Sequence, residues 1–461
     1  MSSPEPTSPI PNPLDGRSLS SATMAPTAGC GPAVVDRGER LSAVDTLRGF
    51  ALLGILLLNI VPFAMHGAAY DNPTAVGGDT GPNLIMWYVL HVLAEGKMRG
   101  MFSLVFGVSV ILFTSRLEGR PDAADLYYRR TLWLLLIGIA HSYLLWAGEI
   151  LFPYAMCGLC LFPLRRLSAR GLAALGASLL VYCCVCQWAN AHATLKTIDE
   201  GKAAVAKAER GESLSEVEQA ARGAWDALRQ ERNPSPEAIA KDIAEWRGNP
   251  WQVIRARGAV VLWLTSHPFY HKGYVDVLAM MILGMSLARF GLFDGRRSAA
   301  DYLKIAVFGY AVGLPLHAWN GWIIVRSHFD PVVQNYASIL YQPGRLAITA
   351  GHMGCLLLLC RTGMLGGLTR RLAAVGQMAL SNYMTHSVVC TFLFTGYGLR
   401  WYGTLQRYQV LYVVAGLWVF QLLVSPWWLA RFRYGPGEWC WRSLTYWQRQ
   451  PMRRPESPSR T

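Results

Sequence analysis

The chain has 461 residues, of which 52% are apolar and only 16% are charged, with 17 Trp and 20 Tyr. This composition is too apolar for a soluble protein of this length, whose surface would have to be charged. The net charge of +14 comes from short basic clusters between apolar runs. Such clusters are typical of loops that orient a membrane protein, and they argue against a nucleic-acid partner, which would need one continuous basic face.

The two ends of the chain differ from the rest. Residues 1–39 are rich in Pro and Ser and poor in large apolar groups, so we expect a disordered cytoplasmic tail. This stretch lacks the short apolar segment of a secretory signal peptide. Residues 448–461 are basic and Pro-rich, and a second disordered tail is expected there.

Apolar runs predict an all-α, polytopic bundle of about ten spans, because a helix needs about 20 mostly apolar residues to cross roughly 30 Å of hydrocarbon. No series of alternating ten-residue segments indicates an outer-membrane barrel. The expected spans lie at about 49–66, 100–115, 131–146, 150–163, 171–189, 275–290, 303–325, 346–359, 372–394 and 410–429. Placing the Arg-Arg loops inside gives a multi-pass membrane protein with both termini in the cytoplasm.

The spans divide into two halves, residues 40–190 and 257–447, separated by a polar helical insert at 191–256 on the outer side. Two amphipathic segments, 84–98 and 254–267, are too short or too polar to span. We expect both to be interfacial or re-entrant at the outer surface.

Intramembrane polar residues are functional candidates, because charge at bilayer depth is costly. In the first span, Arg48 and Asn59 are eleven residues apart, and Arg48 and His66 are eighteen apart. These spacings place the three residues on one helix face, with Arg48 and His66 at opposite ends, about 27 Å apart. The alternative is that Arg48 is a positive-inside anchor and Asn59 a helix–helix hydrogen bond.

A second constellation lies in HSYLLWAGEILFPY, where His141 precedes a tight outer turn and Glu149 opens the next span. A carboxylate beside a His can fix its tautomer and raise its basicity, which suits a general base. Alternatively, Glu149 is favoured at a helix N-terminus by the helix dipole. Further polar groups indicate a cavity open to the outside: His271, Lys272, Asp276, His317, Arg345, His352, Asn382, Tyr383 and His386.

Other kinds of chemistry have weak support. The sequence contains no GxxxxGK[ST], GxSxG or HExxH motif, which disfavours ATP-driven transport, serine hydrolysis and a zinc peptidase site. The pair Cys157–Cys160 could bind a metal or cycle redox state, but most cysteines lie inside apolar runs, where Cys packs as a small apolar residue. No bound metal or cofactor is therefore expected.

Several stretches resemble the YeiB-like bacterial membrane proteins. They are VDTLRGFALLGILLLNI, FSLVFG, HSYLLWAGEILFPYAMCG, VGQMALSNYMTHSVV and FRYGPGEWCWRSLTY, the last resembling the family's C-terminal domain of unknown function 418. The matching positions include Asp45, Arg48, Asn59, His141, Trp146, Gly148, Asn382, Tyr383, Glu438 and Arg442. The chain departs from the family at Glu149, where Asp is usual, and at His386, where Gln is frequent.

The entry helix of this family is similar to that of transmembrane acyltransferases. The resemblance implies transfer of an acyl group from a cytoplasmic donor, plausibly acyl-CoA as co-substrate, to a sugar or lipid acceptor in the envelope. His141, Glu149 and the lesser candidate His66 are the expected catalytic residues. Donor or substrate binding is expected from Asp45, Arg48, Asn59, Asn382, Tyr383 and Arg442. A transporter or channel for a small polar or anionic solute, or a scaffold in the bilayer, is the alternative, and the oligomeric state is not predicted.

Overall fold

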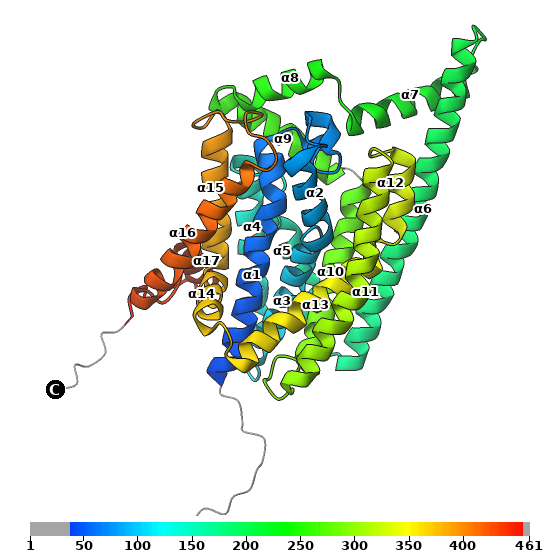
Figure 1. The fold of residues 1–461 in the computed structure, drawn as a ribbon. Coiled ribbons are helices and arrows are strands. Elements are labelled where there is room, and N and C mark those ends of the chain that lie inside the picture. Colours follow the sequence, from blue (N-terminus) through cyan, green and yellow to red (C-terminus); the bar gives the residue numbers. More distant parts are fainter. Residues whose placement is uncertain (1–36, 267, 455–461) are drawn as a thin grey trace, which may run out of the picture. The chain divides into compact units, whose positions relative to one another are not determined.

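The computed structural model describes the backbone of residues 37–266 and 268–454 and the side chains of residues 42–266 and 273–454. Every regular element in these ranges is a helix, which confirms the predicted all-α class (Figure 1). The first elements are α1 (Arg37–Ala64), η1 (Gly67–Ala69), η2 (Pro73–Val76), α2 (Gly81–Leu93), α3 (Lys97–Ser115), α4 (Ala123–Leu144), α5 (Leu151–Leu164), α6 (Ala169–Glu209), α7 (Glu216–Arg232) and α8 (Pro236–Trp246). The later ones are α9 (Pro250–Ser266), α10 (Pro268–Arg289), α11 (Ala299–Arg326), α12 (Pro331–Ile339), α13 (Tyr341–Thr362), α14 (Gly366–Gln377), α15 (Ala379–Phe394), α16 (Val410–Arg431) and α17 (Pro436–Tyr446).

Six helical stretches within the described chain are long and apolar enough to cross a membrane. They are Ser42–Ala64, Gly81–Ser115, Ala169–Glu209, Ala299–Arg326, Tyr341–Thr362 and Val410–Arg431. All six coincide with expected spans, and the count of ten crossings stays a prediction. The tail expected over residues 1–39 lies, up to residue 36, outside the described chain.

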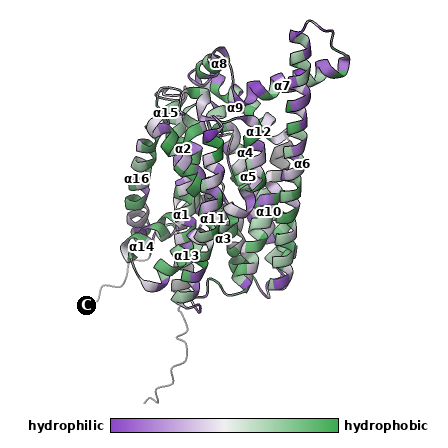
Figure 2. Ribbon diagram, turned by 45° about the vertical axis from the view of Figure 1, so that its right-hand side comes forward, coloured by the Kyte–Doolittle hydropathy of each residue, from purple (hydrophilic) through white to green (hydrophobic). Residues whose placement is uncertain are grey.

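The peripheral helices expose many apolar side chains, and contact of these side chains with water would be unfavourable. The most apolar part of α6 has a mean hydropathy of 1.7, yet only 17% of it is buried within the protein, and the corresponding share is 22% for α11 and 28% for α16. Figure 2 shows hydrophobic residues along the part of α6 that precedes its hydrophilic end. Exposed apolar area of this extent is covered by lipid in a membrane protein. The chain is therefore a helical membrane protein.

Helix α1 lies within the bundle (Figure 1) and is buried over 67% of its apolar stretch. Small residues allow a close crossing with α14: a Cβ on Gly49 would lie 2.0 Å from Leu372 O, and a Cβ on Gly376 would lie 1.9 Å from Asp45 O. Helices α3 and α10 cross in the same way, through Gly107 and Gly284. Such contacts bring two backbones together, as in other membrane bundles.

A break between α2 and α3 falls within residues 84–98, one of the two expected amphipathic segments. Gly96 has a left-handed backbone (φ 69°), and a Cβ there would lie 2.1 Å from the Tyr341 hydroxyl. Helices α2 and α3 on either side of this break together form the stretch Gly81–Ser115, which is long and apolar enough to cross a membrane. The placement of residues 84–98 as interfacial or re-entrant stays a prediction.

The second expected amphipathic segment, residues 254–267, falls in α9 apart from residue 267, which lies outside the described chain. Arg257 joins this helix to the end of α4 by donating to Leu144 O at 2.6 Å. Its placement at the outer surface stays a prediction.

The expected span 372–394 is also interrupted, because the helix stops at Met378 and restarts as α15. The Glu438 carboxylate on α17 accepts hydrogen bonds from Leu380 N (2.6 Å) and Ser381 N (3.2 Å), which are free N–H groups of the new helix. Burial raises the pKa of Glu438. A carboxylate at a helix N-terminus is also favoured by the helix dipole.

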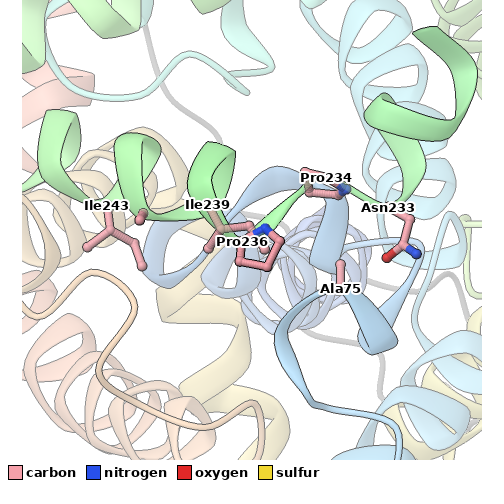
Figure 3. Close-up of a pocket in the computed structure, with 7 residues that line it drawn as sticks. Ala75, Asn233, Pro234, Pro236, Ile239 and Ile243 are labelled. Carbon is pink, nitrogen blue, oxygen red and sulfur yellow. The ribbon is translucent and has the colours of Figure 1, made fainter. Parts of the chain in front are cut away.

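The insert at 191–256 has no sharp start, because α6 continues unbroken through residue 191 to Glu209. Helices α7 and α8 follow, and α8 borders an open hollow of about 550 Å³ beside η2 (Figure 3). Its lining is mainly aliphatic and proline, with Asn233 as the one polar residue of that lining. We call the end of the bundle with η1, η2, α7 and α8 the insert end, and the end with the start of α1, α14 and α17 the tail end.

The C-terminal tail begins later than expected. Arg433 N donates to Met452 O at 2.9 Å, and Arg454 N donates to Arg431 O at 3.2 Å. Trp439 Nε1 donates to Gln450 O at 2.8 Å. Residues 450–454 are therefore held against the end of α16, and residues 455–461 lie outside the described chain.

The close crossing of α3 and α10 yields a stability prediction. In Gly107→Leu, the new Cβ would lie 1.8 Å from Met281 O, so the two backbones must separate. We expect a loss of about 1–3 kcal/mol, the usual cost of overpacking, seen as a lower melting temperature of the purified protein in detergent. Gly416→Leu is the control, because nothing lies within 4 Å of a Cβ on Gly416. Equal melting temperatures for the two variants would contradict the crossing.

Candidate functional site

Arg48 holds the tail ends of three helices together. Its guanidinium donates to Asp45 Oδ1 at 2.5 Å, to Ser109 Oγ on α3 at 2.8 Å and to Gly376 O on α14 at 3.2 Å. Both Arg48 and Asp45 are half-buried. The two residues therefore lie together and have a clear structural role, and their part in ligand binding stays a prediction.

Two further arginines lie near Arg48 at the tail end. Arg130 on α4 places its guanidinium carbon 3.8 Å from the centre of the Trp441 ring, and Trp441 Nε1 donates to Arg130 O at 2.8 Å. Arg442 on α17 lies 4.8 Å from the Tyr434 ring, and both Arg442 and Arg48 are within electrostatic range of Arg130. Within the described residues no carboxylate forms an ion pair with Arg130 or Arg442. We call Arg48, Arg130 and Arg442 the tail-end basic cluster.

His141 is 2% exposed near the end of α4. Its Nε2 lies 2.8 Å from Ser387 Oγ on α15, while its Nδ1 is buried with no hydrogen-bond partner in the described chain. The Ser387 hydroxyl in turn points to Tyr383 O at 3.5 Å. When that hydroxyl donates to Tyr383 O, it accepts from His141 Nε2–H, and a lone pair remains on Nδ1.

The surroundings of His141 are aromatic. The Tyr383 ring centre is 5.2 Å from the His141 ring centre, and Trp146 stacks on Phe63 of α1 at 3.6 Å. Trp146 Nε1 is a second buried donor without a partner in the described chain. Two unsatisfied polar atoms at one helix end are costly unless a ligand or water completes them.

Glu149 does not pair with His141 as expected. Its carboxylate accepts from Leu151 N at 2.5 Å and Phe152 N at 2.8 Å, the first N–H groups of α5. Gly138 allows α5 to begin against α4, because a Cβ there would lie 2.5 Å from Phe152 N. Glu149 therefore caps α5 and fixes its start beside α4, which is the helix-terminus role considered as the alternative.

The remaining positions on the expected polar stripe have different roles. His66 Nδ1 accepts from Ala68 N at 3.1 Å, so the neutral ring has no free lone pair for a general base. Asn59 is half-buried and makes no side-chain hydrogen bond within the described chain. Asn59 and Phe63 are four residues apart on α1, so Asn59 lies one turn inward from the Phe63–Trp146 stack.

Asn382 connects the two sides of the α14–α15 break. Its Nδ2 donates to Val375 O at 3.1 Å and to Ser425 Oγ at 3.1 Å, while Gln421 Nε2 donates to Asn382 O at 2.9 Å. Tyr383 OH accepts from Ile150 N at 3.2 Å. These bonds satisfy backbone groups freed by the break and by the start of α5, so both residues stabilise the walls around His141.

A third group of polar residues surrounds the α2–α3 break. Lys97 is fully buried, and its ammonium contacts His91 O at 2.6 Å and His317 Nδ1 on α11 at 3.1 Å. Arg345 on α13 forms a bidentate pair with Asp276 on α10 at 3.0 and 2.5 Å. We call His91, Glu95, Lys97, Arg99, Asp276, His317 and Arg345 the buried charge cluster; all of its members are buried except Glu95, which is half-buried, and Arg99, which is exposed.

The protonation state of His91 follows from its partners. Its Nδ1 is 2.7 Å from Glu95 Oε2, and its Nε2 is 3.0 Å from Asn320 Oδ1. Asn320 Nδ2 donates to Ala337 O at 2.6 Å, which assigns the amide oxygen to the His91 side. Both ring nitrogens thus face acceptors, which is the arrangement of a doubly protonated, positively charged ring.

Sequence reasoning found only part of this cluster. Asp276, His317 and Arg345 were expected in a polar cavity, and the structure brings them to the same break in α2–α3. The side chains of His271 and Lys272, expected there too, lie outside the described ones. Lys97 and Arg99 lie in the first turn of α3 rather than in a loop, with Lys97 fully buried and Arg99 exposed. The signal in the sequence is that two basic residues fall on the outer side of the predicted topology, where the positive-inside rule does not expect them.

Comparison with known proteins gives a family and no activity. Residues 287–448 match the family described as "Protein of unknown function (DUF418)". The chain is 29% identical to "Uncharacterized protein YeiB" of Escherichia coli K12 over 88% of this chain and 96% of that protein. It is 26% identical to "Uncharacterized protein YxaH" of Bacillus subtilis 168, over 90% and 96% of the two chains. No solved structure matches the chain.

The His91–Glu95 pair provides a second prediction. Glu95→Gln leaves a charged imidazole facing a neutral amide in the protein interior, and breaking a buried pair typically costs about 3–5 kcal/mol. We expect a strongly lowered melting temperature in detergent. Glu200→Gln is the matched control, because Lys196–Glu200 has the same spacing on a helix but is 75% and 55% exposed. A change no larger than that of the control would show that His91 is not charged.

Proposed function

The chain is a YeiB-like membrane protein whose residues 287–448 belong to the DUF418 family, and we propose that it is a transmembrane acyltransferase. It moves an acyl group from a cytoplasmic donor, an acyl-CoA, to a hydroxyl or amine acceptor of an envelope sugar or lipid. In this proposal the protein lies in the bacterial inner membrane with its tail end, and both termini, in the cytoplasm. The insert end then faces the acceptor.

The observation that carries the proposal is the unpaired Nδ1 of His141. A buried imidazole whose other nitrogen is held by Ser387 is oriented for one proton transfer. Nδ1 takes the proton of the acceptor O–H or N–H while the acceptor atom attacks the thioester carbonyl. The tetrahedral intermediate then expels the CoA thiolate, which receives the proton from the imidazolium, so atoms and charge balance.

Two neighbours complete the proposed site. The unpaired Trp146 Nε1 is a candidate donor to the carbonyl oxygen as its negative charge develops. Glu149 acts as a positioning residue, because its cap on α5 fixes the wall opposite His141. His66 has no lone pair for this step and is not included in it.

The donor is proposed to bind at the tail-end basic cluster. Arg130 and Arg442 stack on aromatic rings and have no carboxylate partner within the described chain, so three neighbouring cations repel one another until an anion binds. The phosphates of a CoA donor match this charge, since guanidinium groups bind phosphate through paired hydrogen bonds. Asp45 holds Arg48 in place on its α1 side.

A transporter for a small anionic solute is the second candidate. The specific observation that favours it is a broken helix in each half, α2–α3 at Gly96 and α14–α15 at Met378. Discontinuous helices form the substrate sites of many secondary transporters. Counterflow of a labelled solute into proteoliposomes, in the absence of acyl donor, would favour this candidate over the acyltransferase.

The catalytic assignment predicts the effect of His141→Asn, which keeps the polarity and approximate size but removes the general base. We expect acyl transfer from labelled acyl-CoA to a pooled envelope sugar and lipid fraction to fall about 10²- to 10⁴-fold in proteoliposomes. His66→Asn is the matched control and is expected to retain transfer. Full activity of His141→Asn, or no transfer by the native protein to any acceptor, would rule the proposal out.

The donor assignment predicts a separate kinetic effect. Arg442→Gln is expected to raise the KM for acyl-CoA about tenfold with kcat nearly unchanged, because it weakens binding of donor phosphates remote from the reacting carbonyl. Arg431→Gln is the control, since Arg431 lies over Trp427 outside the cluster. Binding of CoA alone, measured by calorimetry, should weaken by the same factor. If CoA binds Arg442→Gln as it binds the native protein, the donor site lies elsewhere.

A further inference from the structure

Arg99 differs from the other cations of the buried charge cluster in its counter-charge. Its Nη2 lies 3.7 Å from Asp276 Oδ2, too far for a hydrogen bond. Both oxygens of Asp276 already accept from Arg345. The other carboxylate of the cluster, Glu95, is held by His91 at 2.7 Å. No carboxylate in the described chain is therefore hydrogen-bonded to Arg99.

Arg99 is also exposed to solvent while surrounded by protein. Its side chain is 48% exposed, whereas Met98 beside it is 5% exposed and Ser103 one turn further on is 1% exposed. The titratable neighbours of Arg99 come from four different elements: Tyr70 after η1, Tyr154 on α5, Asp276 on α10 and Tyr341 on α13. The accessible surface of Arg99 therefore faces the space between these elements, which a ligand can reach.

This internal space is close to the insert end. Asp71, in the link between η1 and η2, is exposed and has Glu95 and His91 among its electrostatic neighbours. Arg232 and Arg407, at the same end, are also within electrostatic range of Asp71. The approach to Arg99 therefore carries more positive than negative charge, and it would attract an anion.

Arg345 shows what a purely structural arginine looks like in this protein. It is 1% exposed and donates to Asp276 and Gln342. Arg99 has neither this burial nor hydrogen-bonded side-chain partners of this kind.

We propose that Arg99 binds an oxyanion, a phosphate or carboxylate group of a substrate that enters from the insert end. The planar guanidinium fork matches the paired oxygens of either group. Lys97 and the charged His91 add positive potential around the same space. This inference rests on the proposed function only where it identifies that substrate as the acyl acceptor. The acceptor is then an anionic sugar or an anionic lipid, and not a neutral sugar or lipid.

The test measures binding to the purified full-length chain in a neutral detergent with no acyl donor present. The probes are inorganic phosphate, glycerol phosphate, glucuronate and a short-chain phosphatidylglycerol, with glucose and a short-chain diacylglycerol as neutral counterparts. The variants are Arg99→Gln, Arg99→Lys and the matched control Arg120→Gln, whose side chain is 51% exposed near the opposite end of α3.

At least one anionic probe is expected to bind the native chain saturably, and Arg99→Gln to raise its Kd about tenfold or more. Arg99→Lys should raise the Kd by a smaller factor, and Arg120→Gln should leave this binding unchanged. Binding of the soluble probes identifies a free or sugar-linked anion, whereas binding of phosphatidylglycerol alone identifies a lipid headgroup. If Arg99→Gln does not yield a folded protein, Arg99→Lys carries the test.

Two results would overturn the inference: a Kd unchanged by both Arg99 variants, or neutral probes that bind as tightly as the anionic ones. Neither result bears on acyl transfer, which is measured separately through His141. Conversely, an Arg99-dependent anion site in a chain that transfers no acyl group would overturn the proposed function and leave this inference standing.

Discussion

The left-handed backbone at Gly96 is the feature on which the rest of the interior depends. It interrupts an apolar stretch of 35 residues, Gly81–Ser115, and so leaves backbone N–H and C=O groups without their helical hydrogen bonds. Lipid offers these groups no hydrogen-bond partners. The protein satisfies them from within: the Lys97 ammonium takes up His91 O at the end of α2. The buried Lys97 ammonium needs further polar partners, and it contacts His317 on α11. Asp276 on α10 and Arg345 on α13 belong to the same cluster. Three helices distant in sequence, α10, α11 and α13, therefore pack their polar side chains around this one turn.

The freed backbone groups at the α14–α15 break are also satisfied by polar side chains of the protein. Glu438 accepts from the first N–H groups of α15, and Asn382 donates to Val375 O on the other side. The backbone groups Leu380 N, Ser381 N and Val375 O, which the break leaves without helical hydrogen bonds, therefore each have a side-chain partner. At the α2–α3 break, by contrast, Arg99 keeps a charge that no carboxylate neutralises by hydrogen bonding. A cation without a hydrogen-bonded counter-ion in a membrane protein is a functional candidate, whereas the fully bonded Arg345–Asp276 pair is explained by structure alone.

The sequence predicted what depends on local pattern. Long apolar runs and basic loops gave the all-α membrane class, and the spacing in α1 placed Arg48 and Asn59 on one side of a helix. It could not predict contacts between residues far apart in the chain, such as Lys97 with His317, because no local pattern encodes them. Glu149 shows the limit most clearly. Its proximity to His141 in sequence suggested a pair. In the structure the Glu149 carboxylate instead accepts hydrogen bonds from the first N–H groups of α5, which have no partner within the helix.

The core between the two ends bears on the choice between enzyme and transporter. A transporter needs two packings of similar free energy, so that one group of helices can rock against another. Here α1 packs on α14, and α3 packs on α10, through glycines that lie directly against the backbone of the opposing helix. If either helix slides, residues with side chains replace these glycines at the crossing and clash with that backbone. Leu52, Leu56 and Ile60 fill the neighbouring part of α1 at 1% exposure or less. A rigid centre with a basic cluster at one end and an unpaired imidazole towards the other suits a protein that passes only an acyl group across, while donor and acceptor each stay on their own side.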